Sequence, residues 1–268
     1  MQIWEAIFLG IVQGLAEFLP ISSSGHLVFF QTVLNIEEAD LFFDIMLHVG
    51  TLFAVFFVFW RDILELFRKP FRTLLYLIVA TIPAAIVGFL FSDEIEEIFY
   101  GGEWLGVFFL LTAVIMFACE LVAKRRKKTY PLCWRTTVPM GLMQAVAVLP
   151  GISRSGSTIA AGVFAGAETR TVSKFSFLMS VPVILGSAVL ELKDLIFDGG
   201  FQSSVAAYPS AGMFIACVLI GVAVAAVSGL FAIKVMLKVI NTGNYKWFSL
   251  YLVLLSVSCF ILSAYNLL

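Results

Sequence analysis

Six long apolar stretches are the feature that most limits what this chain can fold into. A helix needs about 20 mostly apolar residues to cross the roughly 30 Å hydrocarbon core of a membrane. The stretches that reach or approach this length are Leu41–Trp60, Leu74–Phe91, Leu105–Val122, Phe175–Leu190, Ala211–Ile233 and Trp247–Leu268. Only 13% of the residues are charged, about half the fraction found in soluble domains. We therefore expect an all-α polytopic membrane protein with six transmembrane helices.

Two further apolar regions are interrupted by Pro20 and by Pro150, so they predict a different course through the membrane. The uninterrupted pieces are Ile3–Leu19 and Leu27–Leu34 in the first region, and Val138–Leu149 and Ile159–Ala167 in the second. A helix of 12 residues is only about 18 Å long, which is too short to cross alone. Each region predicts a re-entrant pair of half-helices that enters and leaves the membrane on one side.

The two interruptions resemble each other, which indicates an internal duplication. When residues 10–26 are aligned with residues 141–157, seven of the 17 pairs are identical, among them Gln13 with Gln144 and Ser22 with Ser153. We expect one membrane domain made of repeat 1 (1–130) and repeat 2 (131–268), each with a re-entrant pair and three spans. Because three is odd, the second repeat is inverted relative to the first.

The distribution of charge predicts the orientation. If the loop around Arg61–Arg72 faces the cytoplasm, 15 of the 17 Lys and Arg residues fall in cytoplasmic segments. Acidic residues at 37–40, 93–103 and 194–198 fall in the opposite loops. This agreement with the positive-inside rule holds only if both interrupted regions are re-entrant. It predicts that both termini and the opening of the site face the outside.

Polar side chains inside apolar segments are costly in a membrane, so they are candidates for function. Gln13 and Glu17 are four residues apart and share one helix face. A carboxylate beside an amide oxygen offers the hard ligands that suit Mg²⁺ or Ca²⁺, although Glu17 could also serve in capping or packing. Asp44 and His48 have the same spacing near the outer end of the first span. They either bond to each other or support the site.

The turn before the second half-helix of the first region carries Ser22, Ser23 and Ser24, followed by His26. Free N–H groups at a helix N-terminus, together with hydroxyl groups, favour an anion. A histidine can transfer a proton near neutral pH, although a lone histidine can also be structural. The sequence predicts an anion site here, with His26 as a candidate acid–base group.

Arg154 lies in the second interruption, which reads PGISRSGST from Pro150 to Thr158. Its forked guanidinium suits a phosphate, and another half-helix begins here. Polar and flexible residues around it complete a predicted anion cradle: Ser153, Ser155, Gly156, Ser157 and Thr158. Because its own segment has no acidic residue, Arg154 requires an anion, either Glu17 from the other repeat or a ligand.

These motifs resemble the undecaprenyl-diphosphate phosphatase family, also called the bacitracin-resistance protein family. The resemblance covers the whole chain and rests on Gln13-xxx-Glu17, on SSSGH ending at His26, and on PGISRSGST ending at Thr158. It implies a C55 isoprenyl diphosphate substrate, a divalent cation, the bacterial inner membrane, and recycling of the carrier lipid for peptidoglycan synthesis. It also implies that Glu17, His26 and Arg154 are essential.

The resemblance further implies that Ser23, Ser153, Ser155 and Thr158 line the diphosphate pocket. We expect His26 to act as a general base, either on Ser23 as the nucleophile, which is favoured, or directly on water. Glu17 and Gln13 would hold the metal ion. Expected partners are the substrate and membrane lipids, with no nucleic acid, and a homo-oligomer stays open.

Two other functions compete with this interpretation. A polyprenyl-phosphate flippase or a secondary transporter would also use inverted repeats with broken helices. The type 2 phosphatidic acid phosphatases share SGH and SR motifs, but they need a histidine where this chain has Ala160. The concentration of Glu17, Ser23, His26 and Arg154 favours bond breaking over transport.

Overall fold

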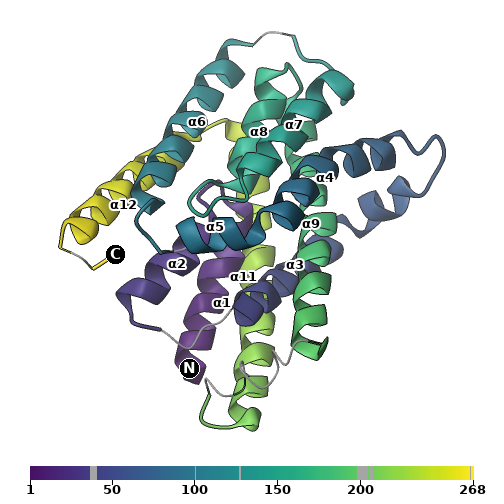
Figure 1. Ribbon diagram of the computed structural model, residues 1–268. Coiled ribbons are helices and arrows are strands. Elements are labelled where there is room, and N and C mark those ends of the chain that lie inside the picture. The colour runs from purple at the N-terminus through teal and green to yellow at the C-terminus, as the bar shows by residue number, and fades with distance from the viewer. Residues whose placement is uncertain (37–40, 100, 127, 198–204, 206–207, 266) are drawn as a thin grey trace.

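A computed structural model describes residues 1–36, 41–99, 101–126, 128–197, 205, 208–265 and 267–268. All named elements of these residues are helices (Figure 1). In chain order they are α1 Ile3–Phe18, α2 Ser23–Val33, α3 Leu41–Leu66, α4 Arg72–Leu90, α5 Ser92–Phe99, α6 Leu105–Arg125, α7 Trp134–Val146, α8 Arg154–Phe164, α9 Thr169–Phe197, α11 Ala211–Thr242 and α12 Lys246–Ala264. The acidic residues at 37–40 and 198, and Lys127, lie outside the described residues.

The six predicted spans are confirmed. Helices α3, α4, α6, α9, α11 and α12 are each long and apolar enough to cross a membrane. Large apolar side chains lie exposed on them, such as Phe57, Phe89 and Val227, each more than two-thirds exposed. Such a surface suits lipid rather than water. The protein is therefore a multi-pass membrane protein. The short helix α5, which precedes α6, was not predicted.

Each interrupted region forms two short helices joined by a turn. In the first, α1 and α2 pack on each other across residues 19–22, and in the second, α7 and α8 do so across residues 147–153. The helix ends therefore lie where Pro20 and Pro150 predict them. The re-entrant course of these pairs through a membrane stays a prediction.

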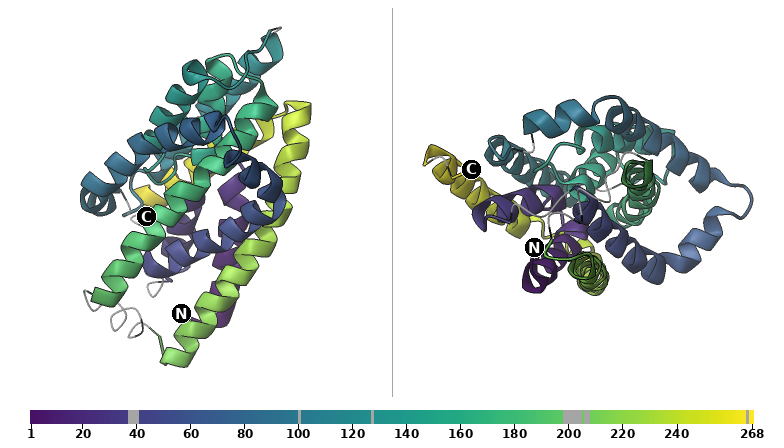
Figure 2. Two further views of the ribbon diagram at one scale, coloured as in Figure 1. Left: turned by 90° about the vertical axis from the view of Figure 1, so that its right-hand side faces the viewer. Right: turned by 60° about the horizontal axis from the view of Figure 1, so that its bottom comes forward.

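Helices of the two sequence repeats pack across each other. Helix α1 lies along α11 and α7 lies along α4 (Figures 1 and 2). Glycines at these contacts leave no room for a side chain. A Cβ atom at Gly10 would lie 2.8 Å from the Gly221 carbonyl oxygen, and one at Gly141 would lie 2.7 Å from the Ala80 carbonyl oxygen. Small residues allow this close approach between membrane helices.

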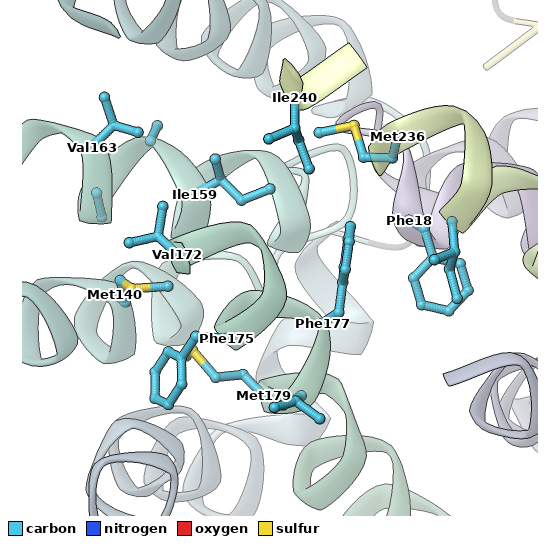
Figure 3. Close-up of a cluster of buried hydrophobic side chains, with 14 of the residues drawn as sticks. Phe18, Met140, Ile159, Val163, Val172, Phe175, Phe177, Met179, Met236 and Ile240 are labelled. Carbon is cyan, nitrogen blue, oxygen red and sulfur yellow. The ribbon is translucent and has the colours of Figure 1, made fainter. Parts of the chain in front are cut away.

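The largest buried apolar cluster joins α3, α8, α9 and α11 (Figure 3). Phe18 at the end of α1 is fully buried in it and meets Phe177 edge to face, with ring centroids 5.8 Å apart. Such a contact between rings adds to the benefit of burial. Because Glu17 immediately precedes Phe18, this packing fixes the position of a carboxylate inside the fold.

Candidate functional site

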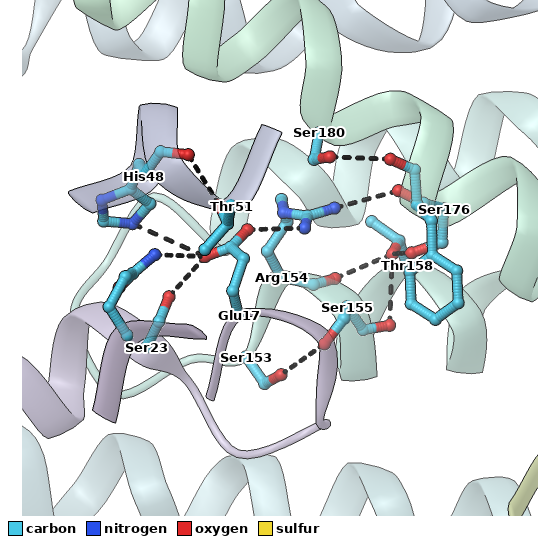
Figure 4. A network of polar contacts seen from close by, with 12 residues as sticks. Glu17, Ser23, His48, Thr51, Ser153, Arg154, Ser155, Thr158, Ser176 and Ser180 are labelled. Atoms are coloured by element: carbon cyan, nitrogen blue, oxygen red, sulfur yellow. Dashed lines mark hydrogen bonds and ion pairs between the residues drawn. The ribbon is translucent and has the colours of Figure 1, made fainter. Parts of the chain in front are cut away.

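The carboxylate of Glu17 is the centre of a buried polar network (Figure 4). Its Oε1 accepts a bond of 2.7 Å from Arg154 Nη2, and its Oε2 accepts bonds of 2.7 Å from Ser23 Oγ and 3.1 Å from Gln13 Nε2. His48 Nε2 lies 3.5 Å from the same Oε2. The side chain of Glu17 is only 4% exposed. A buried charge of this kind requires such partners.

Arg154 is the first residue of α8, and its bonds to Glu17 and Ser176 use only part of its N–H donors. Its Nη1 donates to the Ser176 carbonyl oxygen at 2.9 Å, and its Nη2 binds Glu17. A guanidinium has five N–H donors, so the bonds to Ser176 and Glu17 leave up to three for an anion. The side chain is 14% exposed and lies at a cavity. Of the two anions predicted for Arg154, the structure contains Glu17 from the other repeat, and a ligand would share the same guanidinium.

The two half-helix turns are capped in the same way and bonded to each other. Ser22 Oγ accepts from Gly25 N at 3.4 Å, and Ser153 Oγ accepts from Gly156 N at 3.1 Å. Such caps satisfy free N–H groups at a helix start. Ser22 Oγ also accepts from Gly151 N at 3.1 Å, which joins the first turn to the second. The two interruptions thus form one unit.

A cavity of about 270 Å³ opens beside this network. Its polar lining comes from both interruptions and from two spans, and the remainder is apolar. The lining residues with polar side chains are Glu17, Ser22, Ser23, Ser24, Asp44, His48, Gln144, Arg154 and Ser187. The apolar side includes Leu27, Ile45, Val183 and Ile184. A cation, hydroxyl groups and an apolar wall in one cavity suit an amphipathic anion.

The structure places His26 away from this network. Its Nδ1 lies 2.7 Å from the Ser22 carbonyl oxygen and its Nε2 lies 2.7 Å from the Tyr251 hydroxyl. The ring is 3% exposed and stacks on Tyr251. It is not among the lining residues of the cavity. Ser23, which was expected to bond to His26, donates to Glu17 instead.

The predicted anion cradle after Arg154 is used mainly to hold helices together. Ser155 Oγ donates to the Leu19 carbonyl oxygen at 3.1 Å, and Thr158 Oγ1 lies 2.7 Å from Ser176 Oγ. Ser153, Gly156 and Ser157 are buried as well. None of these five residues lines the cavity.

Asp44 and His48, the polar pair predicted in the first span, contact different groups. His48 Nδ1 lies 2.8 Å from the backbone carbonyl oxygen of Asp44, so the pair is joined through the backbone. The Asp44 carboxylate accepts from Gln31 Nε2 at 2.8 Å. Both residues line the cavity. Of the two, His48 makes the direct approach to Glu17.

Gln13 and Glu17 fit the predicted divalent cation in the type of their donor atoms. Gln13 is fully buried, and its Oε1 has no hydrogen-bond partner among the described residues. An orphaned buried oxygen beside a carboxylate is an arrangement that a cation would satisfy. The described residues hold no group of three His, Cys, Asp or Glu side chains placed for a metal ion. A cation here therefore needs the amide oxygen or the substrate.

Comparison of the sequence with known proteins identifies the family of this chain. The family described as bacitracin resistance protein BacA matches residues 6–258. The chain belongs to this family. It is 38% identical over 265 residues to the undecaprenyl-diphosphatase of Carboxydothermus hydrogenoformans, with 98% of each chain covered. It is 40% identical over 264 residues to that of Moorella thermoacetica, with 96% of each covered.

Three residues of this member of the bacitracin resistance family were not singled out from the sequence. Ser176 holds Arg154 through its carbonyl group, Tyr251 holds His26, and Gln144 lines the cavity. The repeat alignment pairs Gln144 with Gln13, and this was the available signal for it. Ser176 acts through its backbone and Tyr251 lies 225 positions from His26, so neither contact leaves a sequence pattern.

Proposed function

We propose that this protein hydrolyses undecaprenyl diphosphate to undecaprenyl phosphate and inorganic phosphate. The reaction recycles the carrier lipid for peptidoglycan synthesis and gives resistance to bacitracin. The observation that carries the proposal is the cavity at Glu17, where Arg154 meets the serines of the first interruption. Membership of the bacitracin resistance family and relatives with the name undecaprenyl-diphosphatase support it.

The cavity matches the two chemical parts of such a substrate. Arg154 and the N-terminus of α2 can bind the diphosphate, because both supply N–H donors and positive charge. Leu27, Ile45 and Ile184 offer an apolar wall on the side where the prenyl chain would leave toward lipid. Binding energy from both parts would orient the terminal phosphate against Ser23.

Ser23 is the nucleophile that the geometry favours. Its Oγ donates to Glu17 Oε2 at 2.7 Å, so the carboxylate is placed to accept the proton during attack. The new bond joins Ser23 Oγ to the terminal phosphorus, and the bond from that phosphorus to the bridging oxygen breaks. Undecaprenyl phosphate leaves, and water then releases phosphate from the serine. Direct attack by water, with Glu17 as base, is the alternative.

His26 keeps a predicted role as an essential residue. As a general base it would have to leave its contacts with Ser22 and Tyr251. We favour a positioning role, in which the ring holds the Ser22 carbonyl and so the start of α2. The serines and the helix N-terminus would then face the cavity in a fixed geometry.

We further propose a divalent cation, Mg²⁺ or Ca²⁺, held by Glu17 and Gln13. When bound, it would neutralise charge that develops on the phosphate oxygens, as metal ions do in phosphoryl transfer. Arg154 supplies the fixed positive charge of the protein itself. Chelators are expected to abolish phosphate release, and full activity in excess chelator would exclude the metal ion.

The expected location is the cytoplasmic membrane, with both termini and the cavity mouth on the outer side. Asp44 in the first turn of α3 and Ser187 far along α9 line the cavity. Asp44 follows the acidic residues at 37–40 in sequence, and Ser187 precedes Asp194 in the second half of α9. The charge distribution assigns both acidic segments to the outside.

Phosphate release by the purified protein in detergent tests the enzyme against the flippase or transporter. The enzyme is expected to release one phosphate per undecaprenyl diphosphate, and Glu17→Ala is expected to lose this activity. A protein that moves the lipid between leaflets of a vesicle but releases no phosphate would support the alternative function.

A further inference from the structure

We propose that His48 is a ligand of the divalent cation at Glu17, so that the site also accepts a transition-metal ion such as Mn²⁺. This inference rests on the cation of the proposed function and adds a nitrogen ligand to it.

The first observation is the state of the His48 ring. Its Nδ1 lies 2.8 Å from the Asp44 carbonyl oxygen. A carbonyl oxygen only accepts hydrogen bonds, so Nδ1 carries a proton, and in the neutral ring the lone pair is on Nε2. A histidine that binds a metal ion through one nitrogen commonly donates its other N–H to a backbone carbonyl in this way. The bond to Asp44 therefore prepares His48 Nε2 as a ligand.

The second observation is the distance between the two donor atoms. His48 Nε2 lies 3.5 Å from Glu17 Oε2, which is longer than a charge-assisted hydrogen bond of about 2.7–2.9 Å. Two ligands each about 2.1 Å from one metal ion are separated by about 3.0 Å at an octahedral angle and about 3.4 Å at a tetrahedral angle. The observed separation is slightly longer than the tetrahedral value, so a small movement of the His48 ring toward Glu17 would bring both atoms within reach of one ion.

The third observation is the orphaned oxygen of Gln13. Its amide nitrogen lies 3.1 Å from Glu17 Oε2, while its fully buried Oε1 has no hydrogen-bond partner among the described residues. The two ends of an amide exchange places when the group turns over. The turned amide would present an oxygen at a distance from Oε2 that also suits two ligands of one ion. One amide oxygen, one carboxylate and one imidazole then share the ion.

His26 provides a natural contrast, since it is the only other histidine of the chain. Both of its ring nitrogens face protein groups, the Ser22 carbonyl and the Tyr251 hydroxyl. Neither nitrogen of His26 faces a carboxylate, whereas His48 Nε2 faces Glu17 Oε2. An imidazole ligand also changes which ions bind, because imidazole suits transition metals whereas Ca²⁺ takes oxygen ligands.

Pulsed electron paramagnetic resonance of bound Mn²⁺ tests the proposal on the full chain in detergent, purified with a tag that contains no histidine. We expect coupling of Mn²⁺ to a nitrogen nucleus, and this coupling should change its frequency when histidine is supplied with ¹⁵N. His48→Gln should remove the nitrogen coupling and weaken Mn²⁺ affinity at least about tenfold. The matched variant His26→Gln should keep the coupling.

The outcomes separate this inference from the proposed cofactor. If titration calorimetry detects no divalent cation on the wild-type protein, both the cofactor and its His48 ligand are excluded. If Mn²⁺ binds but the ¹⁵N label leaves its spectrum unchanged, only the role of His48 is excluded. The same holds if the coupling survives in His48→Gln. The labelled wild-type protein decides whether a histidine binds the ion. Because the chain has only two histidines, coupling that persists in His26→Gln assigns the ligand to His48 even if His48→Gln fails to fold.

Discussion

Replacing Arg154 by lysine is the most informative single change, because lysine keeps the charge but loses the planar fork. In the structure the guanidinium reaches Glu17 Oε1 at 2.7 Å and the Ser176 carbonyl oxygen at 2.9 Å at the same time. A lysine ammonium has no fork to span both while facing a phosphate. We expect Arg154→Lys to fold and insert, since Glu17 keeps a cation, but to lose most activity.

The size of this loss follows from the contacts involved. A hydrogen bond to a charged group contributes about 1.5–3 kcal/mol, and each 1.36 kcal/mol of transition-state stabilisation is a factor of ten. Losing one such contact to Arg154 therefore lowers kcat/KM by about 10- to 150-fold. Because a phosphate would use more than one arginine donor, we expect a loss of at least about 10²-fold. The assay is phosphate release from a prenyl diphosphate in detergent micelles.

A double change separates catalysis from folding. Arg154→Ala leaves the buried Glu17 carboxylate without its cation, which should cost about 3–5 kcal/mol of stability. Adding Glu17→Ala removes the unpaired charge, so thermal stability should recover while phosphate release stays absent. If activity returned together with stability, Arg154 would act only through the fold. A folded Arg154→Lys protein with wild-type kcat/KM would refute the reasoning.

Three other predictions follow from packing, capping and charge. Gly14→Ala should lower thermal stability by about 1–3 kcal/mol, because its Cβ would overlap a side chain of α11, whereas Gly88→Ala, which meets nothing within 4 Å, should not. Ser22→Ala should cost about 1–3 kcal/mol, because a buried N–H of the second interruption loses its acceptor; unchanged thermal unfolding would contradict the bridge. In a Cys133→Ser background, an impermeant thiol reagent should label a cysteine placed at Glu97 in intact cells, but not one at Arg126. The reverse labelling would overturn the orientation.

Spans were predictable from the sequence because a helix in lipid must be apolar along its whole length. The stretches Leu105–Val122 and Ala211–Ile233 each begin where the observed helix begins, and only their polar ends extend further. Helix α5 was not predicted because it is short and acidic, with apolar residues on one side only. Composition alone does not distinguish such a segment from a loop.

The site was predictable in part. Glu17 and Arg154 meet as expected, because a charge at membrane depth needs a partner, whereas the bond from Ser23 to Glu17 was not predicted. The two histidines differ in their contact with Glu17, and sequence motifs do not predict this difference. His26 follows the serines directly in sequence, yet the turn of α2 carries its ring toward α12 and Tyr251. His48 comes from another helix, and only the packing of α3 beside α1 brings it to Glu17.

Glu17 accepts hydrogen bonds from both interruptions, which makes the two halves of the fold unequal at the site. Under the repeat alignment Ser23 corresponds to Arg154, and each contacts a different oxygen of the one carboxylate. The position that corresponds to Glu17 is Val148. Two identical halves would carry the same residue at both positions of each pair. With one acid, one hydroxyl and one guanidinium, the two halves form a single site that has a direction, and neither half alone supplies all three groups.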